Sequence, residues 1–274
     1  MTKITPAPKG DKTEDILVKN HQPVALLFIP AKLMDSTLHR NIFNQIKHRI
    51  SSQHGFYRSR SVQSNLLHFT QFIFSSFDKG AQVDAVYTDF QKAFDKVNHR
   101  TLLQKMENLN FSKDLLLLFS SYLKNRHQYV AYKGFESRKF ECPSGVPQGS
   151  NLGPLLFLLF INDITDVVTS SLILLYADDI KLCKSINCRE DVLALQNDVD
   201  AMVSWSEVNC LPFNIQKCQK ITFTRKAGRE IKTTYAMKQE VLQSTKKIRD
   251  LGIIMDRKLN FNDHINQVIR KSKR

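Results

Sequence analysis

The stretch that most constrains this chain is Tyr176-Ala177-Asp178-Asp179, where two carboxylates adjoin between two apolar runs. Residues 171–176 lead into it and residues 180–183 lead out. Two β-type runs separated by two or three residues predict a hairpin, with both carboxylates at its tip. Aspartate is a poor strand residue and adjacent like charges repel, so a divalent cation is the simplest reason for placing two there. On this stretch alone, a solvated acidic turn is an equal alternative.

The charge balance indicates a polyanionic partner. The 274 residues include 40 Lys and Arg against 26 Asp and Glu, which gives a formal net charge of +14 and a pI near 9.6. Residues 214–274 alone hold 16 Lys and Arg but only 5 Asp and Glu. A nucleic acid or an anionic membrane surface would fit such an excess. A solvated basic surface is the plain alternative.

Neither a signal peptide nor a membrane span is evident. Residues 1–12 are polar, and the longest apolar stretches, 115–119 and 155–161, are far shorter than a spanning helix. The five cysteines are odd in number and fit no zinc spacing. We therefore expect reduced, mostly buried thiols in an intracellular protein without a membrane partner.

Periodicity predicts helices and strands in alternation. No regular element is expected in residues 1–30, where Pro6, Pro8 and Gly10 interrupt the chain and Pro30 ends an apolar run. A helix is expected over 38–50 with Asp35 or Ser36 as its cap, and Ser61 should cap another. The other expected helices cover 102–109, 115–123, 152–160 and 190–208; the expected strands cover 82–90, 129–140 (as a hairpin), 221–224 and 251–255.

Five blocks follow one another along the chain. They are Asp-Phe-Gln-Lys-Ala-Phe-Asp-Lys-Val at 89–97, the turn-rich segment 144–154, the Ala-Asp-Asp hairpin, Asn-Ile-Gln-Lys at 214–217 and Asp-Leu-Gly at 250–252. This ordered set resembles the palm of a reverse transcriptase. The sequences of the blocks are most similar to those of non-LTR (LINE-type, jockey-like) retrotransposon polymerases. The likeness runs from residues 6–9 to the 259–265 region. Five ordered blocks are a specific signal, whereas a lone Ala-Asp-Asp would be weak.

The resemblance implies an α+β fold of the right-hand polymerase type. An antiparallel palm sheet would pack on helices, with the thumb largely missing, so the chain would be a fragment. Residues 1–80 would form the fingers, with interleaved elements to about 145. Residues 81–250 would form the palm, and residues 251–274 the primer-support turn and the start of the thumb.

The resemblance also implies RNA-directed DNA synthesis during retrotransposition. The partners would be an RNA template, a DNA primer and dNTPs, and a functional protein would act in the nucleus. Asp89, Asp178 and Asp179 would bind two Mg²⁺ ions, for which Mn²⁺ could substitute. Asp179 could instead stabilise the hairpin. Lys217 would act as a general acid toward pyrophosphate or only through its charge.

Further residues resemble those that bind nucleotide. Phe94 would exclude a 2′-hydroxyl, although a core aromatic is the alternative. Gln148 and Gly149 would contact nucleotide or template, and the glycine would permit close backbone approach. Lys9 and Arg60 would grip the triphosphate, unless they are ordinary exposed cations.

Two more segments complete the expected site. Leu251 and Gly252 resemble the turn that supports the primer end. Asp95 could be a third metal ligand, but we expect it to cap the helix that follows.

One departure weakens the expected dNTP grip. Gln22 stands where the family usually has arginine, and a neutral amide cannot form a charged, bidentate phosphate clamp. A catalytically impaired nucleic-acid-binding remnant is therefore the competing hypothesis. A metal-dependent nuclease is a third, but it would not need the blocks that contain Phe94 and Gln148.

Overall fold

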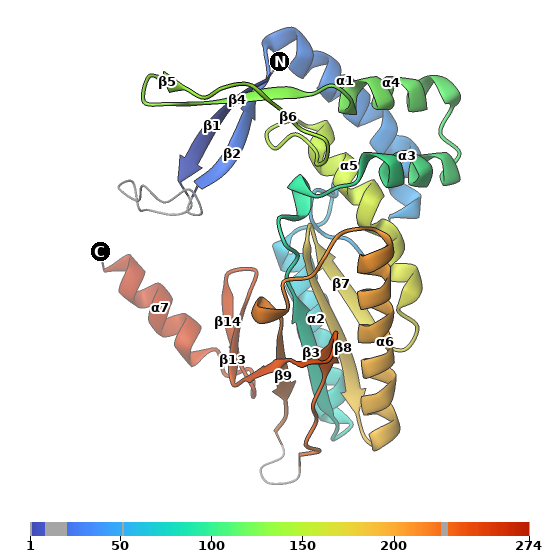
Figure 1. Ribbon diagram of the computed structural model, residues 1–274. Helices are drawn as coiled ribbons and strands as arrows, with labels where there is room; N and C mark the ends of the chain where they lie inside the picture. Colours follow the sequence, from blue (N-terminus) through green and yellow to red (C-terminus); the bar gives the residue numbers. More distant parts are fainter. Residues whose placement is uncertain (1, 9–20, 51, 226–229, 274) are drawn as a thin grey trace. The chain divides into compact units, whose positions relative to one another are not determined.

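The computed structural model describes residues 2–8, 21–50, 52–225 and 230–273, except for the side chain of residue 22 (Figure 1). The chain forms two compact units. Unit 1 comprises Met1–Ile50 and Lys92–Asn162, and unit 2 comprises Ser51–Gln91 and Asp163–Arg274. Each unit is therefore assembled from two separate segments. The fingers and palm boundaries expected from the sequence stay a prediction about function.

Unit 2 is built on a five-stranded sheet in the order β12-β9-β3-β8-β7. The central strand β3 (Gln82–Thr88) is antiparallel to both β8 (Asp179–Ile186) and β9 (Gln219–Phe223). Strand β7 (Leu172–Tyr176) is antiparallel to β8, and only β12 (Gln243–Thr245) joins in parallel. The mainly antiparallel sheet expected of a palm is thus present.

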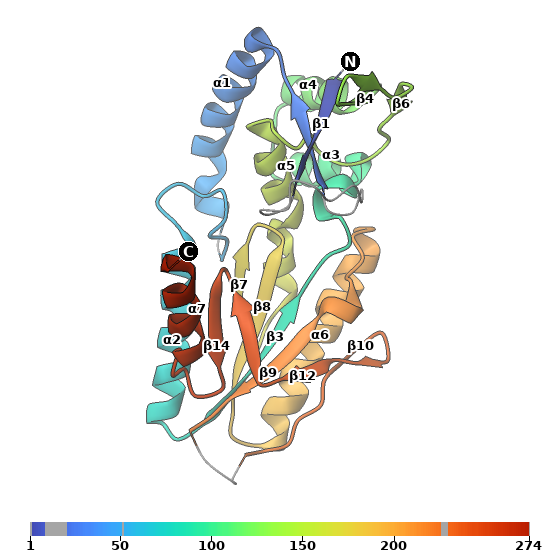
Figure 2. The same cartoon turned by 90° about the vertical axis from the view of Figure 1, so that its left-hand side faces the viewer.

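Helices cover both faces of this sheet (Figure 2). On one face α2 (Val62–Asp78) inserts Phe69 and Ile73 into a core that includes alternate residues of β3. On the other face α6 (Arg189–Val208) packs against β8. Successive strand residues point to opposite faces. On β3, Val83 and Ala85 belong to the core with α2, whereas the other face carries buried polar residues that form hydrogen bonds, namely Gln82, Asp84 and Thr88. The expected Ser61 cap of α2 is confirmed, since Ser61 Oγ accepts a hydrogen bond from the Ser64 backbone N–H at 3.2 Å.

Smaller elements complete unit 2. A two-stranded hairpin of β13 (Lys247–Asp250) and β14 (Ile253–Asp256) lies apart from the main sheet. Its residues Ile248 and Met255 are buried in the core beneath α2. The other elements are the hairpin β10 (Ala236–Met237) and β11 (Glu240–Val241), the 3-10 helices η4 (Asn162–Val167, which begins at the end of unit 1) and η5 (Ile215–Lys217), and α7 (Asn262–Ser272).

Unit 1 contains a second sheet and four helices within its described residues. The strands are β1 (Thr2–Pro8), β2 (His21–Leu26), β4 (His127–Tyr132), β5 (Phe135–Glu136) and β6 (Phe140–Glu141). The helices are α1 (Ile29–Ile46), α3 (His99–Asn108), α4 (Lys113–Leu123) and α5 (Leu152–Ile161), with 3-10 turns η2 (Lys47–Arg49) and η3 (Ala93–Asp95). The buried helix α5 is apolar all round, which is typical of a helix surrounded by protein.

The expectation that residues 1–30 lack regular structure is wrong. Strand β1 pairs with β2 at residues 3–8, but with β4 only at residues 2–4. Pro6 and Pro8 thus lie where, among the described residues, one side of β1 has no paired strand, a position that tolerates a missing N–H. Pro30 does not end an element either; it lies in the first turn of α1, where the missing N–H has no intrahelical partner to lose.

Asp35 does cap a helix, but not its own. It is buried in the middle of α1, and its Oδ2 accepts hydrogen bonds from the backbone N–H groups of Asn151 at 2.5 Å and Leu152 at 3.3 Å. These donors belong to the start of α5. The carboxylate therefore stabilises the positive N-terminal end of a helix more than a hundred residues away.

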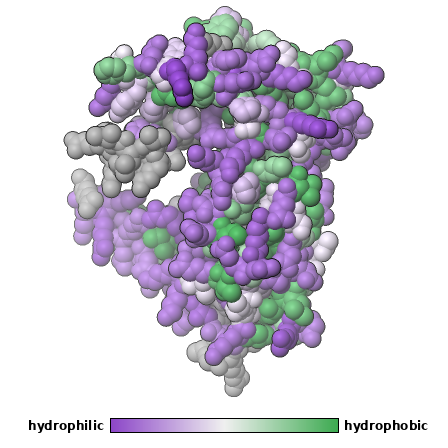
Figure 3. Space-filling view, in the orientation of Figure 1, coloured by the Kyte–Doolittle hydropathy of each residue, from purple (hydrophilic) through white to green (hydrophobic). Residues whose placement is uncertain are grey.

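The surface is mostly polar. Figure 3 shows one face, on which hydrophilic residues predominate and apolar residues form scattered patches. Within the described part of the chain, no helix combines the length and apolarity that crossing a bilayer requires. All five cysteines are free; Cys183 and Cys218 are buried, but Cys188 and Cys210 are exposed, so the expectation of mostly buried thiols is wrong.

Candidate active site

The Ala-Asp-Asp stretch forms the expected hairpin. Strand β7 ends at Tyr176, β8 begins at Asp179, and these two residues pair across the turn. Ala177 adopts a left-handed φ of 56°, which a tight two-residue hairpin turn requires. Ala177 is buried, Asp178 is half-buried and Asp179 is exposed. The turn thus holds both carboxylates at one end of the sheet.

Strand register brings a third carboxylate to the same end. Thr88 of β3 is the partner of Ile180 of β8, and Thr88 Oγ1 donates a hydrogen bond to the Ile180 carbonyl at 3.3 Å. Since the strands are antiparallel, Asp89 follows Thr88 toward the position opposite Asp179. Asp89 and Asp179, about ninety positions apart in sequence, therefore lie at the same end of the sheet. The family resemblance, which assigns Asp89, Asp178 and Asp179 to one metal site, implied that they would lie close together.

The three carboxylates repel one another. Burial, followed by the charges of Asp178 and Asp89, raises the pKa of Asp179 to about 6. Burial and then the charge of Asp89 also raise the pKa of Asp178, although a backbone hydrogen bond opposes the shift. Such mutual destabilisation of ionised groups is typical of functional clusters.

Asp89 is anchored to the segment that contains Lys217. Its carbonyl accepts a hydrogen bond from the Asn214 N–H at 2.7 Å, and the adjacent Phe90 ring stacks on Phe213 with centroids 4.3 Å apart. Lys217 Nζ lies 3.0 Å from Asp89 Oδ2 as an ion pair, with the lysine side chain 68% exposed. Lys217 therefore lies beside the carboxylate cluster, and its exposure leaves it free to move; its role toward pyrophosphate stays a prediction.

The residues fit a divalent cation bound jointly with a substrate. Asp89 Oδ2 is buried, and no donor among the described residues has hydrogen-bond geometry toward it, although Lys217 pairs with it electrostatically. No three His, Cys, Asp or Glu side chains in the described ranges converge into a complete protein-only metal cage. Mg²⁺ is commonly bound by one or two carboxylates plus phosphate oxygens and water, so two carboxylates such as Asp89 and Asp178 would be enough, and their role as ligands stays a prediction.

Arg60 differs from an ordinary exposed cation in its burial and in its contacts. It is half-buried, its guanidinium stacks over the Tyr57 ring at 4.3 Å, and Nη1 donates a hydrogen bond to the Gln53 carbonyl at 2.7 Å. Its assignment to the triphosphate stays a prediction. Lys9, its expected companion, lies outside the described residues, as does the side chain of Gln22.

The other expected nucleotide-binding residues gather in unit 1. Gln148 Nε2 donates a hydrogen bond to Asp95 Oδ1 at 2.9 Å. Gly149 has a φ of 104°, and a Cβ there would lie 2.8 Å from the Ala25 carbonyl oxygen, so only glycine fits. The Phe94 ring stacks on Phe157 of α5 with centroids 4.4 Å apart. Its contact with a core residue is compatible with either role considered for Phe94.

Asp95 does not cap the following helix, contrary to expectation. Asn98 does so instead, because its Oδ1 accepts a hydrogen bond from the Thr101 N–H at 3.0 Å. Asp95 is freed from capping and holds the Gln148 amide. Both Asp95 and Asn98 precede the helix in the sequence, and only the structure shows which of them caps it.

Leu251 and Gly252 form the turn between β13 and β14. Both have positive φ, 45° and 93°, and Asp250 pairs with Ile253 across the turn. The strand expected over 251–255 therefore begins only at Ile253. The prediction of a turn at Leu251-Gly252 is consistent with this geometry, while its role toward a primer is not tested by it.

Comparison with known proteins identifies the family. The family model for "Reverse transcriptase (RNA-dependent DNA polymerase)" matches residues 7–255. The chain belongs to the reverse transcriptase family. Its relatives include a probable RNA-directed DNA polymerase from transposon BS of Drosophila melanogaster, 30% identical over 265 residues, and that from the mobile element jockey of Drosophila funebris, 31% identical over 262 residues. This reverse transcriptase domain is thus of the non-LTR, jockey-like kind.

The same comparisons show how much of each relative the chain spans. It aligns over 92% of its own length but spans only 29% and 28% of those two relatives. Among solved structures, telomerase from Candida tropicalis in complex with a fragment of telomeric RNA gives a TM-score of 0.64 at 11% identity, covering 95% of this chain and 44% of that one. Telomerase from Candida albicans gives 0.60 at 11% identity, over 93% and 45%. These structures confirm the α+β fingers–palm fold of the domain.

Gln53, to which the sequence analysis assigned no role, holds the Ala-Asp-Asp turn of this reverse transcriptase domain. Gln53 Oε1 accepts hydrogen bonds from the Ala177 and Gly55 N–H groups at 2.8 and 2.7 Å, and its Nε2 donates to the Ala177 carbonyl at 3.1 Å. A Cβ on Gly55 would lie 2.3 Å from the Ala177 nitrogen. The lone glycine in the 53–60 loop was the available signal, since such a residue often marks close backbone approach.

Proposed function

We propose that this domain catalyses RNA-directed DNA synthesis, extending a DNA primer with dNTPs on an RNA template as part of retrotransposition. One observation carries the proposal: the β3–β8 register aligns Asp89 with the Asp178-Asp179 turn at one end of the sheet. Burial and like charges raise the pKa values of Asp178 and Asp179, so a positive partner would stabilise their ionised forms. A solvated acidic turn would not require Asp89 beside it.

Asp89 and Asp178 would hold the divalent cations, with Asp179 beside them. When bound, Mg²⁺ would lower the pKa of the primer 3′-hydroxyl and neutralise charge on the phosphates. Lys217 would release Asp89 when that carboxylate serves as a metal ligand. The exposed ammonium could then turn toward the leaving pyrophosphate and donate a proton or stabilise its charge.

The remaining residues would bind and orient the substrates. Gln148 would present its amide from a position fixed by Asp95, and Gly149 would bring the backbone close to nucleotide or template. Phe94, backed by Phe157, would block a 2′-hydroxyl, while Arg60 and Lys9 would pair with the triphosphate. The excess of basic residues after position 214 would contact the nucleic-acid backbone, and action on chromosomal DNA would place the protein in the nucleus.

Primer extension on a poly-rA template with Mg²⁺ tests the proposal. We expect incorporation of dTTP by the parent chain and a loss of about a thousandfold or more in Asp178→Asn. Asp166→Asn is the matched control, because Asp166 is an exposed carboxylate of the same unit on η4. Absence of incorporation by the parent, with salt-sensitive binding of an RNA–DNA duplex retained, would instead establish the impaired nucleic-acid-binding remnant.

A further inference from the structure

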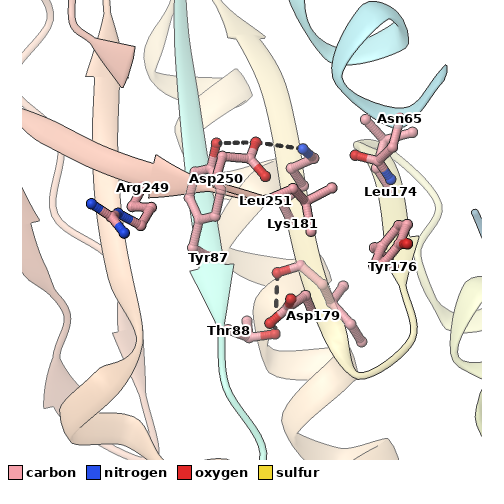
Figure 4. Close-up of a pocket in the computed structure, with 11 residues that line it drawn as sticks. Asn65, Tyr87, Thr88, Leu174, Tyr176, Asp179, Lys181, Arg249, Asp250 and Leu251 are labelled. Carbon is pink, nitrogen blue, oxygen red and sulfur yellow. Dashed lines mark hydrogen bonds and ion pairs between the residues drawn. The ribbon is translucent and has the colours of Figure 1, made fainter. Parts of the chain in front are cut away.

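A buried ion pair connects the catalytic strand to the primer-support hairpin. Lys181 Nζ of β8 lies 2.5 Å from Asp250 Oδ2 of β13, and the two side chains are only 5% and 4% exposed. The Tyr87 hydroxyl of β3 donates a second hydrogen bond to the same carboxylate oxygen at 3.0 Å (Figure 4). Three elements of unit 2 therefore converge on one carboxylate.

The position of each charge in sequence is informative. Lys181 is two residues after Asp179, so both side chains lie on the same face of β8. Asp250 immediately precedes the Leu251-Gly252 turn. The pair and the turn line a small cavity of about 70 Å³ together with Asp179 (Figure 4). A displacement of the ion pair would thus reach Asp179 on one side and the Leu251-Gly252 turn on the other through no more than two residues.

Apolar packing alone would leave the hairpin position underdetermined. Strands β13 and β14 form their own two-stranded sheet, so no backbone ladder joins them to β8 among the described residues. Ile248 and Met255 secure the hairpin to the core by apolar contacts, which are not directional. At the end of the hairpin away from the turn, the Thr224 N–H donates to the Arg257 carbonyl at 2.9 Å and Arg257 Nε donates to the Thr222 carbonyl at 3.0 Å, so these bonds fix that end and not the turn. The Lys181–Asp250–Tyr87 hydrogen bonds are directional and would fix one arrangement.

Stability does not explain this pair. Desolvation of two charges offsets most of their attraction, and neutral replacements of similar shape are often as stable. The ammonium also lies 4.5 Å from the centre of the Phe69 ring, a contact that offsets only part of that cost. The remaining consequence of burying the Lys181–Asp250 pair is that it fixes the position of the β13–β14 hairpin relative to the β7–β8 hairpin.

We propose that Lys181 and Asp250 are positioning residues that hold the Leu251-Gly252 turn in a fixed place relative to Asp179. If the domain is the polymerase proposed above, on which this part of the inference rests, the pair sets where the primer 3′-end lies relative to the carboxylates. Neither residue touches the reacting atoms. Their effect is on alignment, which dominates the rate of a two-substrate reaction.

The test removes both charges together. Lys181→Met combined with Asp250→Asn avoids leaving one buried charge unpaired and keeps an acceptor for the Tyr87 hydroxyl. The control is Lys247→Met combined with Asp263→Asn. That pair joins β13 to α7 with the same residue types and the same 2.5 Å distance, but its side chains are 58% and 45% exposed.

Hydrogen exchange in the free protein is the first measurement. We expect amide exchange in residues 247–256 to quicken by about tenfold or more in the Lys181/Asp250 double variant, with the melting temperature close to that of the parent. The control should change by less than about twofold. Unaltered exchange in the Lys181/Asp250 variant would overturn the proposal, whether or not the chain polymerises.

Kinetics then test the consequence for the primer. In an active parent, the double variant should lower kcat by about tenfold while the KM for dNTP stays within about twofold. A primer ending in 2-aminopurine should also fluoresce more strongly in the variant without turnover, because its 3′-base is less firmly held. Equal kcat and equal fluorescence would refute the positioning role. A parent that extends no primer would count against the proposed polymerase function, and the exchange result would still decide whether the pair holds the hairpin.

Discussion

The clearest test of the carboxylate cluster is Asp179→Asn in the metal-free protein. In the folded chain the pKa of Asp179 rises from its ordinary value of 3.8 to about 6, chiefly through burial and then through Asp178 and Asp89. The folded state therefore holds a proton that the unfolded state releases between pH 4 and pH 6. Stability must fall as pH rises through this window, because ionisation is unfavourable in the folded state.

The magnitude follows from the pKa difference. A rise of about two pH units corresponds to about 3 kcal/mol for a fully buried group. Because Asp179 is exposed to solvent, screening reduces the expected effect to about 1 kcal/mol. The variant should thus gain about 1 kcal/mol relative to the parent between pH 4 and pH 7.5, since an amide does not ionise.

Urea denaturation at several pH values measures this difference. Glu240→Gln, on the exposed hairpin strand β11, is the control and should show no comparable pH-dependent gain. Mg²⁺ at about ten times its Kd should restore about 1.4 kcal/mol to the parent, because a ligand that binds only the folded state stabilises it. If the variant gains no stability relative to the parent as pH rises, the three carboxylates do not repel as argued.

Three further predictions concern other parts of the site. Asp35→Ala should lower the free energy of unfolding by about 2 kcal/mol, because α5 loses its cap; an unchanged urea midpoint would refute this role. Phe94→Val should increase rNTP incorporation in an active enzyme, and unaltered sugar selectivity would assign Phe94 to the core alone. Gly55→Ala should destabilise the protein by about 1–3 kcal/mol and slow primer extension, since its Cβ would collide with the Ala177 nitrogen; a fully active variant of parental stability would contradict the tight contact.

Local sequence determined the elements whose signals are local. The two apolar runs and the two-residue break between them produced the hairpin that has Ala177 and Asp178 at its turn. Ser61 and the periodic residues after it produced α2 with its capping box. The order of the five blocks was sufficient to predict the antiparallel palm sheet with Asp89 at the end of a strand adjacent to the hairpin.

Tertiary structure alone decided the interactions between distant segments. Asp35 caps α5 from 116 positions away, and the Gln53 amide holds the Ala177 turn from 124 positions away. The first strands of unit 1 exist because they pair with each other and with β4, despite their prolines. A residue's own neighbours in sequence carry no information about such partners, so propensity misassigned each of them.

The pairing of Lys181 with Asp250 is the sharpest instance of this division. The sequence placed one charge just after the Asp178-Asp179 turn and the other before the Leu251-Gly252 turn, but neither position signals burial. Only the packing of β13 and β14 beneath α2 excludes water from both and brings them within 2.5 Å. Local patterns thus determined which residues form the site, and long-range packing decided how they are held in place, because burial and directional hydrogen bonds depend on the folded neighbours.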